Sequence, residues 1–594
     1  MNSLEKVFSE RSDLQILNMW REISDINLPQ KKSFNLGVAA TFTVEQLLPY
    51  LGVCLYENGF TAPQINVAPY NQLIQTCFNY KAQFNGKAPN AILLLWRIEN
   101  LIPELDQLIW DDANIIPNLI ERITELVAAV KHLSTKFNGC ILISLPEYPI
   151  SQFLSLHDYV LQRKLQGIMI QARQMIMVEL GNTSNITTID IDNSLRLVGA
   201  KNAYDSRSAY LYRSPYSKIM MKQVAWDIVH CLNVKFLPTK KCLVLDCDNT
   251  LWGGIVGEDS IFGLELGNDF PGSVFKDFQR QVLNLQKRGI LLALCSKNNE
   301  NDVWEVFEQH DEMVLKREHL AAWRINWQSK AVNIASLSKE LNIGLDSFVF
   351  VDDNPTEISA IQSALPEVSC ISVPEELADF PSFFAEHRFF DALSITQEDS
   401  LRTVMTQHEQ ERRKLQGELN TQDFFSSLRL CVNVKEGKEI ELERITQLIN
   451  KTNQFNLSTV RKTIEDVKHI FDSDKWKIFT LRVSDKFGDY GLVGVSLVKY
   501  DTDTAELETY LLSCRVLGRG VEDAFLNCIG KNMALSGICK MRAIFIPTPK
   551  NALAANFLKE QNFLYKGDNL WEINIDNLKA PPSYLQIDES CAME

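Results

Sequence analysis

The sequence predicts an α/β protein made of several domains. Short apolar runs of strand length alternate with helix-length stretches through the first part of the chain, which favours sheets covered by helices. Three adjacent strand-like runs near the C-terminus suggest an antiparallel meander instead. The chain of 594 residues is too long for one hydrophobic core, because domains average about 150 residues.

The first predicted domain, the N-terminal block, covers residues 1–236. Its strand candidates are Asn35–Ala40, Ile92–Ile98, Cys140–Leu145 and Ile186–Ile191. Thr43, with Gln46 three residues later, has the spacing of a helix capping box. No Gly-Asp-Ser nucleophile turn is present, so we expect a docking or scaffold role. Asp190 and Asp192 follow a strand, where aspartates form turns as often as sites.

Four further regions complete the expected organisation. The middle block covers 237–375, a helical connector 376–420, the C-terminal block 421–576, and a loose tail 577–594, which contains two adjacent prolines. The strands expected in the C-terminal block are Trp476–Val483, Leu492–Tyr500 and Ala505–Cys514.

Composition excludes several classes of protein. Sixty Lys and Arg against 75 Asp and Glu give a net charge of −15, which argues against nucleic acid or an anionic membrane surface as the main partner. No apolar run approaches the length of a membrane-spanning helix, and we expect no secretory signal. The thirteen cysteines are scattered without a CxxC pair, which is typical of reduced thiols in a cytoplasmic protein.

An acidic pair follows the first strand of the middle block. Cys242–Leu245 is a short apolar run, and Asp246 and Asp248 come directly after it. Because strand side chains alternate, both carboxylates can project to the same side at the carboxyl end of the sheet. Two such carboxylates repel each other unless a cation lies between them, and oxygen ligands favour Mg²⁺. One carboxylate can then attack phosphorus while the other exchanges a proton with the leaving oxygen.

Three later segments fit the same chemistry. A second apolar strand ends at Ser296, whose hydroxyl can hold a phosphoryl oxygen. Lys330 stands at the head of a predicted helix, where its ammonium can neutralise the nucleophile and the phosphate. The strand Phe348–Val351 leads to Asp352 and Asp353, a further acidic pair. Each segment alone is weak evidence, but the four in this order predict a phosphate-handling site.

The series Asp-x-Asp-x-Thr, Ser, Lys, Asp-Asp resembles the haloacid dehalogenase (HAD) superfamily, which implies a HAD-like Rossmannoid middle block. The resemblance implies that Asp246 is the phosphorylated nucleophile and Asp248 the general acid/base. It implies phosphoryl binding by Thr250, Ser296, Asn298 and Lys330. It also implies Mg²⁺ bound by Asp246, the Asp248 carbonyl, Asp352 and Asp353. The short separation of the first two motifs leaves no room for a large lid domain.

The match is closer to the FkbH-like group of that superfamily, over about residues 200–575. The segments that carry it are Asp246–Gly257, Cys295–Asn299, Arg324–Trp327, Val351–Pro355, Asn450–Leu457 and Phe487–Gly491. Members of the group load a glyceryl unit from 1,3-bisphosphoglycerate onto an acyl carrier protein for polyketide-type biosynthesis. The resemblance also implies a flavodoxin-like or SGNH-hydrolase-like fold for the N-terminal block.

A glycine-rich loop marks the C-terminal block. The run Arg515-x-x-Gly518-Arg519-Gly520 lies between a strand and a helix, where backbone amides and arginines can hold a pyrophosphate. The spacing resembles the GNAT acyltransferase fold, and so does the segment that begins at Asn551. The resemblance implies that these residues bind coenzyme A or the phosphopantetheine arm of a carrier. The alternative is a strand-to-helix turn that binds nothing.

Transfer of a glyceryl group needs a thiolate, and two cysteines are placed for it. Cys247 points away from the neighbouring carboxylates, and their charge would raise the pKa of its thiol. Cys514 precedes the glycine-rich loop, whose helix-terminal amides and arginines would lower the pKa of its thiol. We therefore favour Cys514 as the acyl carrier.

Three functions are compatible with these motifs. The first is a bifunctional enzyme that dephosphorylates a small phosphorylated acid and loads an acyl carrier protein. The second is a simple Mg²⁺-dependent phosphatase with a non-catalytic GNAT-like block. The third, a non-catalytic scaffold, is disfavoured because nothing structural requires so many polar groups at one sheet edge.

Overall fold

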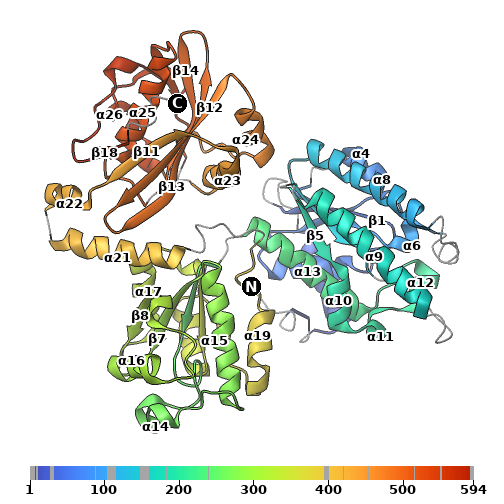
Figure 1. The fold of residues 1–594 in the computed structure, drawn as a ribbon. Helices are drawn as coiled ribbons and strands as arrows, with labels where there is room; N and C mark the ends of the chain where they lie inside the picture. The colour runs from blue at the N-terminus through green and yellow to red at the C-terminus, as the bar shows by residue number, and fades with distance from the viewer. Residues whose placement is uncertain are drawn as a thin grey trace. The chain divides into compact units, whose positions relative to one another are not determined.

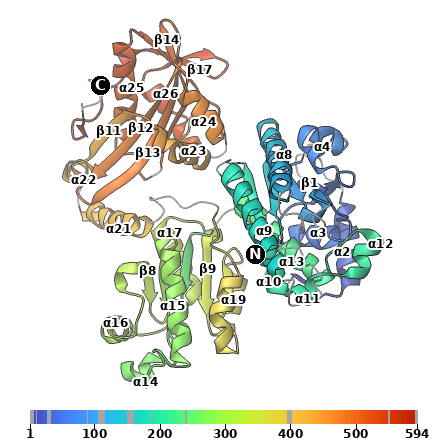
Figure 2. The ribbon, with the colours of Figure 1, turned by 45° about the vertical axis from the view of Figure 1, so that its right-hand side comes forward.

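The structure is a computed structural model in two compact units (Figures 1 and 2). One unit comprises Met1–Thr239 and Ser382–Leu393, and the other comprises Lys240–Pro381 and Ser394–Glu594. The residues described are all except 1–6, 9–10, 27–32, 87–88, 104–114, 148–158, 182, 184, 238–239, 393–400, 419, 453, 514, 549–550 and 589–594.

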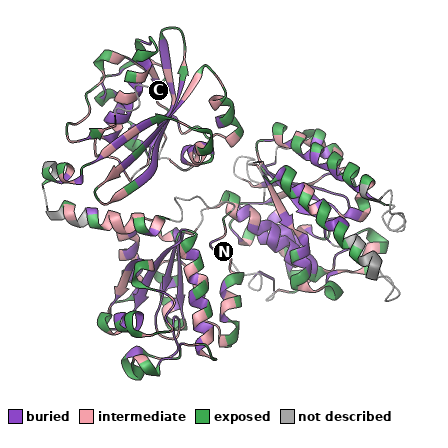
Figure 3. Ribbon diagram, in the orientation of Figure 1, coloured by how far each residue is buried: buried purple, intermediate pink, exposed green. Residues whose placement is uncertain are grey.

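The N-terminal block contains a five-stranded parallel sheet in the order β2-β1-β3-β4-β5. The strands are β1 (Asn35–Ala40), β2 (Gln64–Val67), β3 (Ala91–Leu95), β4 (Cys140–Leu145) and β5 (Ile186–Asp190). Every residue of β1, β3 and β4 is buried, as the purple ribbons in Figure 3 show, which explains their uninterrupted apolar sequences. The predicted strands at β1 and β4 are confirmed, whereas the short, half-exposed β2 was missed.

Helices cover both faces of this sheet. They are α2 (Asp13–Ser24), α3 (Leu48–Glu57), α4 (Leu73–Phe78), α5 (Tyr80–Gln83), α6 (Ile98–Leu101), α8 (Ile115–Lys136), α9 (Tyr159–Leu180), α10 (Ile191–Val198), α11 (Ala200–Ala203), α12 (Ser206–Tyr212) and α13 (Lys218–Phe236). The expected capping box at Thr43 was wrong, because α3 begins only at Leu48 and has no side-chain cap. The Thr43 amide donates instead to the Arg213 carbonyl, which keeps this segment outside the helix.

The middle block forms a second five-stranded parallel sheet, in the order β10-β9-β6-β7-β8. Its strands are β6 (Cys242–Leu245), β7 (Leu291–Ser296), β8 (Leu320–Ile325), β9 (Phe348–Asp352) and β10 (Ser369–Ser372). Its helices are α14 (Val256–Gly263), α15 (Gly272–Lys287), α16 (Glu300–Gln309), α17 (Lys330–Leu341) and α18 (Pro355–Ala364). The chain order reverses on either side of β6, so the carboxyl ends of β6, β7 and β9 meet at the switch point where such sheets bind ligands.

The C-terminal block is an eight-stranded mixed sheet in the order β16-β17-β15-β14-β13-β12-β11-β18. The strands are β11 (Cys431–Glu436), β12 (Trp476–Asp485), β13 (Gly488–Tyr500), β14 (Thr504–Leu512), β15 (Lys540–Ile544), β16 (Leu564–Gly567), β17 (Leu570–Asn574) and β18 (Gln586–Ile587). The helices are α22 (Thr421–Leu428), α23 (Leu442–Lys451), α24 (Ile464–Phe471), α25 (Val521–Leu535) and α26 (Phe557–Glu560). The predicted meander is confirmed as β12-β13-β14, but the sequence pattern did not predict the strands at either side of it.

The connector is not one helix. Part of it, Ser382–Leu393, belongs to the first unit, where Arg388 pairs with Asp227 at 3.0 Å and Asp391 contacts His230 at 2.9 Å. The charged part forms α21 (Arg402–Glu418) in the second unit. Polar side chains of α21 hydrogen-bond to neighbouring elements of that unit.

The expectation of a loose tail was wrong for residues 577–588. The strand β18 pairs in parallel with β11, and the ring of Tyr584 stacks on Phe425 at 5.4 Å between centroids. Leu585 is buried, so apolar packing outweighs the local effect of the prolines. No helix among the described residues has both the length and the apolar composition needed to cross a membrane.

Candidate functional site

The predicted phosphate-handling residues meet at one edge of the middle sheet. Asp246 directly follows β6, Ser296 ends β7, Asp352 ends β9, and Lys330 is the first residue of α17. All four side chains are buried. Four segments far apart in the sequence come together because β6 lies between β7 and β9 in the parallel sheet.

Lys330 lies between two of the carboxylates. Its Nζ is 3.0 Å from Oδ2 of Asp246 and 2.6 Å from Oδ2 of Asp352. Burial disfavours the charge on Lys330, but the two aspartates outweigh it and raise the pKa of the ammonium above its ordinary value. Lys330 therefore stays positively charged where negative charge gathers.

Three carboxylates form a group that fits a divalent cation. One oxygen each from Asp246, Asp352 and Asp353 lies within 4.8 Å of the others. Oδ1 of Asp246 is buried and accepts no hydrogen bond from the described residues. Burial, together with the charge of Asp246, raises the pKa of the Asp352 carboxyl. A hard cation would stabilise this set of ligands. Mg²⁺ is suited to it, because Mg²⁺ binds through a small number of carboxylate oxygens.

Asp248 is held apart from that group. Its Oδ1 accepts hydrogen bonds from Nε1 of Trp252 at 2.9 Å and from the amide of Val256 at 3.2 Å. Its Oδ2 accepts from Nδ2 of Asn298 at 2.9 Å. Three donors fix the orientation of this carboxylate, as a proton-transferring group requires. Among the described residues, its carboxylate is not part of the three-carboxylate group.

Polar groups suited to phosphoryl oxygens surround the aspartates. Nδ2 of Asn298 also donates to Oγ of Ser296 at 3.1 Å, so the two predicted residues are brought together. The hydroxyl of Thr250 is buried and has no hydrogen-bond partner among the described residues. Unpaired buried hydroxyls are costly, and a ligand oxygen would satisfy this one.

A short flap follows β6. Asn249 has a φ of 51°, and its Oδ1 accepts from the amide of Gly254, which turns the chain. Gly253 then pairs with Glu265 in an antiparallel bridge around α14. The flap and α15 fill the whole interval between β6 and β7, which confirms that no large lid is inserted there. Sequence reasoning missed Trp252 as a partner of Asp248; its place four residues later was the available signal.

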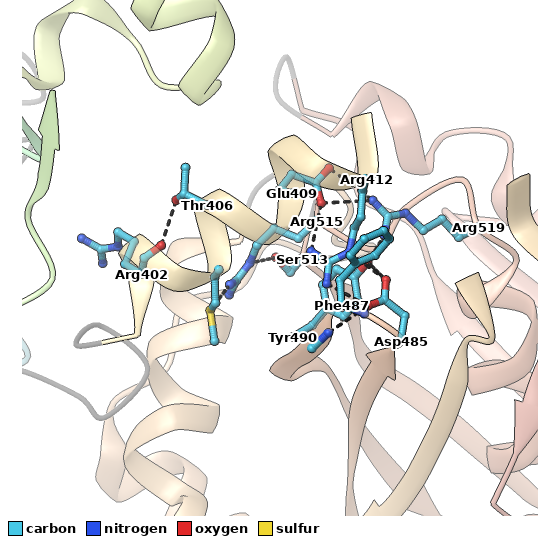
Figure 4. A network of polar contacts seen from close by, with 12 residues as sticks. Arg402, Thr406, Glu409, Arg412, Asp485, Phe487, Tyr490, Ser513, Arg515 and Arg519 are labelled. Carbon is cyan, nitrogen blue, oxygen red and sulfur yellow. Dashed lines mark hydrogen bonds and ion pairs between the residues drawn. The ribbon is translucent and has the colours of Figure 1, made fainter. Parts of the chain in front are cut away.

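The glycine-rich loop of the C-terminal block makes mainly internal contacts (Figure 4). Nη2 of Arg519 lies 3.3 Å from Oε1 of Glu409 in α21, and Nη1 donates to the Tyr490 hydroxyl. Nη1 of Arg515 contacts Sδ of Met405 at 2.9 Å. Gly518 and Gly520 have φ values of 73° and 72°, a region that explains why glycines stand there.

Asn551, predicted to bind coenzyme A or phosphopantetheine, uses its side chain for internal hydrogen bonds. Its buried side chain donates to the carbonyls of Asn456 at 3.0 Å and Ile546 at 2.9 Å, and its oxygen accepts from the Thr548 amide. The structure thus uses both ends of this amide to hold neighbouring backbone.

Of the two candidate thiols, the structure describes Cys247 but not Cys514. Cys247 is fully buried, and burial followed by the charge of Asp246 raises the pKa of its thiol well above the ordinary value. This agrees with the expectation that Cys247 packs in the core. Cys514 lies outside the described residues, so its role stays a prediction. The described cysteines are all free.

The carboxyl edge of the N-terminal sheet carries a buried ion pair. Nε of Arg97 lies 2.7 Å from Oε1 of Glu147, and the Tyr216 hydroxyl donates to Oε2 of Glu147 at 2.9 Å. Asp190, which we considered as a site residue, caps α10 by accepting from the amides of Asp192 and Asn193. A structural role therefore accounts for Asp190.

Comparison with known proteins finds one solved structure that shares a fold with more than half of this chain. No family model and no curated protein matches the chain. The N-terminal part of protein BF1531 from Bacteroides fragilis, a structure containing a phosphatase domain complexed with Mg, is 22% identical. It covers 63% of this chain and 99% of its own, with a TM-score of 0.56. The two chains share a fold over that stretch.

Two further similar structures are acetyltransferases. One is an acetyltransferase of the GNAT family from Staphylococcus aureus (12% identity, 24% of this chain, 99% of its own, TM-score 0.20). Another is spermidine N-acetyltransferase from Vibrio cholerae in complex with CoA and spermine (13%, 25%, 96%, 0.20). With scores this low, the description of the C-terminal block rests on its own strand order.

Proposed function

We propose that the chain is a Mg²⁺-dependent phosphatase joined to an acyl-transfer block. Its substrate would be a phosphorylated three-carbon acid of the 1,3-bisphosphoglycerate type, and its acceptor the phosphopantetheine thiol of an acyl carrier protein. The observation that carries the phosphatase part is the position of Lys330 between Asp246 and Asp352, beside the unpartnered Oδ1 of Asp246. The resemblance to the FkbH-like group and the magnesium-bound phosphatase-domain fold of BF1531 support it.

The chain's own residues account for phosphate removal. Asp246 attacks the phosphorus of the phosphate ester, so the P–O bond to the leaving alkoxide breaks while an aspartyl phosphate forms. Asp248, fixed by Trp252 and Asn298, protonates that alkoxide and then takes a proton from the water that hydrolyses the aspartyl phosphate. Mg²⁺ held by Asp246, Asp352 and Asp353 would neutralise phosphoryl charge.

Acyl transfer would follow at the remaining acyl phosphate. A thiolate attacks the carbonyl carbon, a thioester forms and inorganic phosphate leaves. We propose Cys514 as the first thiol and the carrier's phosphopantetheine as the second. Cys247 is a poor candidate because burial keeps its thiol protonated. The N-terminal block would serve in docking.

One observation favours a simpler second function. The arginines of the glycine-rich loop already contact Glu409, Tyr490 and Met405, so the C-terminal block can also be non-catalytic. The chain would then be a phosphatase of another small metabolite.

An intact-mass experiment separates the two. The protein is incubated with Mg²⁺, 1,3-bisphosphoglycerate and a phosphopantetheinylated carrier, and the carrier is weighed. A glyceryl adduct supports loading; phosphate release without an adduct on any carrier supports the simpler function. Asp246→Asn should abolish release, while Asp277→Asn, at an exposed carboxylate on α15 of the same block, should not. No release from any phosphorylated acid would refute both.

The enzyme-bound intermediate has its own test. A mass increase of one glyceryl group on the protein should disappear in Cys514→Ser and survive in Cys247→Ser. The opposite pattern would assign the thiol to Cys247.

A further inference from the structure

Helix α21 lies against the glycine-rich loop that follows β14 (Figure 4). Arg519 of the loop reaches Glu409 and the Tyr490 hydroxyl, and Arg515 reaches Met405. The side chain of Arg519 is only 12% exposed. Both arginines that a phosphate would need are therefore directed into contacts within the same unit.

A buried ion pair holds α21 in this position. Arg412 donates to both carboxylate oxygens of Asp485, at 2.7 and 2.9 Å, and is 3% exposed. Asp485 also accepts a hydrogen bond from the Tyr490 hydroxyl at 2.8 Å, so Tyr490, which contacts Arg519, belongs to the same network. Bidentate, buried pairs are costly to break once formed, which makes α21 a fixed neighbour of the loop.

The inner side of the loop faces a carboxylate of the chain itself. Burial raises the pKa of the Glu522 carboxyl above its ordinary value, although hydrogen bonds from the backbone of Glu522 and Gly518 oppose this effect. Glu522 thus places an acidic group at the first turn of α25, where an external anion would otherwise be favoured.

The C-terminal segment closes the outer side. A Cβ added at Gly520 would lie 2.5 Å from Cγ of Pro582, so the backbone there has no room for a ligand without a shift of that proline. The Tyr584 hydroxyl donates to the carbonyl of Arg519 at 3.2 Å.

The gap between β14 and β15 is also filled. These parallel strands pair only from Thr504 to Leu507 on β14, which leaves the second half of β14 without that neighbour. The Leu457 amide donates to Tyr510, the Leu512 amide to Phe455, and the Ile546 amide to the Leu457 carbonyl. Residues 455–457 thus bridge the diverging strands and are buried. A pantetheine arm, which carries two amides, would need those same backbone groups.

We propose that the C-terminal block is closed to coenzyme A, and that the Arg515–Gly520 loop is the docking site of helix α21. The loop arginines and the free edge of β14 each have a partner from this chain. Free coenzyme A would have to displace all of them, whereas the phosphopantetheine arm of a carrier protein would reach the acyl group only when docking of the carrier displaces these contacts. This inference depends on the proposed function in one respect: the acyl group would come from the phosphorylated acid and not from an acyl-CoA.

Calorimetric titration of the full chain tests the first half. Coenzyme A and, separately, 4′-phosphopantetheine should give no binding up to about 1 mM, the weak limit of specific association. Micromolar binding of either compound that Arg519→Gln abolishes would overturn the proposal. Comparison of the coenzyme A titration with the 4′-phosphopantetheine titration would then show whether the loop binds a pyrophosphate or a single phosphate.

A double-mutant cycle tests the second half. Arg519→Gln and Glu409→Gln should each lower Tm by about 2–4 °C. The decrease in Tm of the double variant should be smaller than the sum of the two single decreases, because both substitutions remove the same ion pair. Arg542→Gln, which breaks the more exposed Arg542–Glu572 pair on β15 and β17, is the matched control and should shift Tm by less. Additive losses, or no loss in Arg519→Gln, would contradict the proposal. Phosphate release is assayed in parallel, so failure of the phosphatase assignment would show independently.

Discussion

Nδ2 of Asn298 donates a hydrogen bond to Oδ2 of Asp248 across 2.9 Å and joins the loop after β7 to the loop after β6. Asn298 also contacts Ser296, so one amide positions both the carboxylate proposed to transfer a proton and the hydroxyl proposed to bind a phosphoryl oxygen. The relationship gives Asn298 a role that can be measured.

Asn298→Ala should lower kcat for phosphate release by about 100-fold with a smaller change in KM, because a misplaced acid/base group costs mainly transition-state stabilisation. Steady-state kinetics at saturating Mg²⁺ provide the measurement. Asn284→Ala, at an exposed position on α15, is the control and should behave as wild type. An unchanged kcat in Asn298→Ala would argue that Trp252 and the Val256 amide alone suffice.

Removal of the cation should abolish phosphate release. We expect chelation by EDTA to eliminate activity and Mg²⁺ to restore it, because Asp246, Asp352 and Asp353 converge within 4.8 Å. Saturating Mg²⁺ should also raise Tm, since a ligand at about 100 times its Kd stabilises the folded state by about 2.7 kcal/mol. Asp352→Asn should remove that Tm increase, whereas Asp379→Asn, an aspartate in the 3₁₀ turn Leu377–Asp379 outside the carboxylate group, should keep it. Equal Tm increases in both variants would exclude this group as the cation site.

Lys330 should stabilise the fold as well as the site. Lys330→Met leaves Asp246 and Asp352 buried without their counter-charge, which should cost about 3–5 kcal/mol of unfolding free energy. Added Mg²⁺ should recover part of the loss by taking over the neutralisation. Urea unfolding with and without Mg²⁺ measures both effects. Lys297→Met, which removes the more exposed pair with Glu357, should cost no more than about 1 kcal/mol. A Lys330→Met protein as stable as wild type in EDTA would contradict this account.

The N-terminal block should lose stability as pH rises towards neutrality. Burial raises the pKa of the Glu147 carboxyl to about 7 from an ordinary value of 4.5, although Arg97 opposes it. The folded state therefore holds this proton more tightly than the unfolded state. Its stabilisation is complete below about pH 4.5 and is lost as pH rises through about 7. The slope should reach about 1.4 kcal/mol per pH unit.

Glu147→Gln should flatten that slope, because it removes the titrating group. Hydrogen exchange of peptides from β3 and β4, measured from pH 4.5 to 7.5 and corrected for intrinsic rates, reports this block separately from the rest of the chain. Glu179→Gln, at an exposed ion pair with Lys131, should retain the wild-type slope. A slope unchanged in Glu147→Gln would show that another group titrates.

The middle block shows how far pattern reasoning reaches. Apolar strands followed by aspartates or serine are local signals, and Asp246, Ser296 and Asp352 indeed stand at strand ends that meet. Trp252 and Asn551 show the limit. The contact from Trp252 to Asp248 depends on how the flap folds back. Asn551 was assigned to ligand binding together with the glycine-rich loop, but its side chain donates to the Asn456 carbonyl instead.

Errors elsewhere have one cause. The connector and the tail were predicted from local charge and prolines, and β2 was not predicted at all. Long-range partners decided their structure: Asp485 for α21, β11 for the tail and β1 for β2. Such partners lie between 29 and 155 residues away, and the local sequence does not indicate them.

The sequence by itself determined the α/β class, the order of the blocks and the residue types available for phosphate chemistry, because strand periodicity and the chemistry of carboxylates are local properties. Tertiary structure alone decided which groups face one another. It set Lys330 between two aspartates, where charge attraction offsets the cost of burying the ammonium group. It also set Glu409 and Glu522 beside the glycine-rich loop, where an arginine and backbone amides have internal partners. Hydrogen bonds and charges act over a few ångströms, so the same motif becomes a site or a docking surface according to what the fold packs against it.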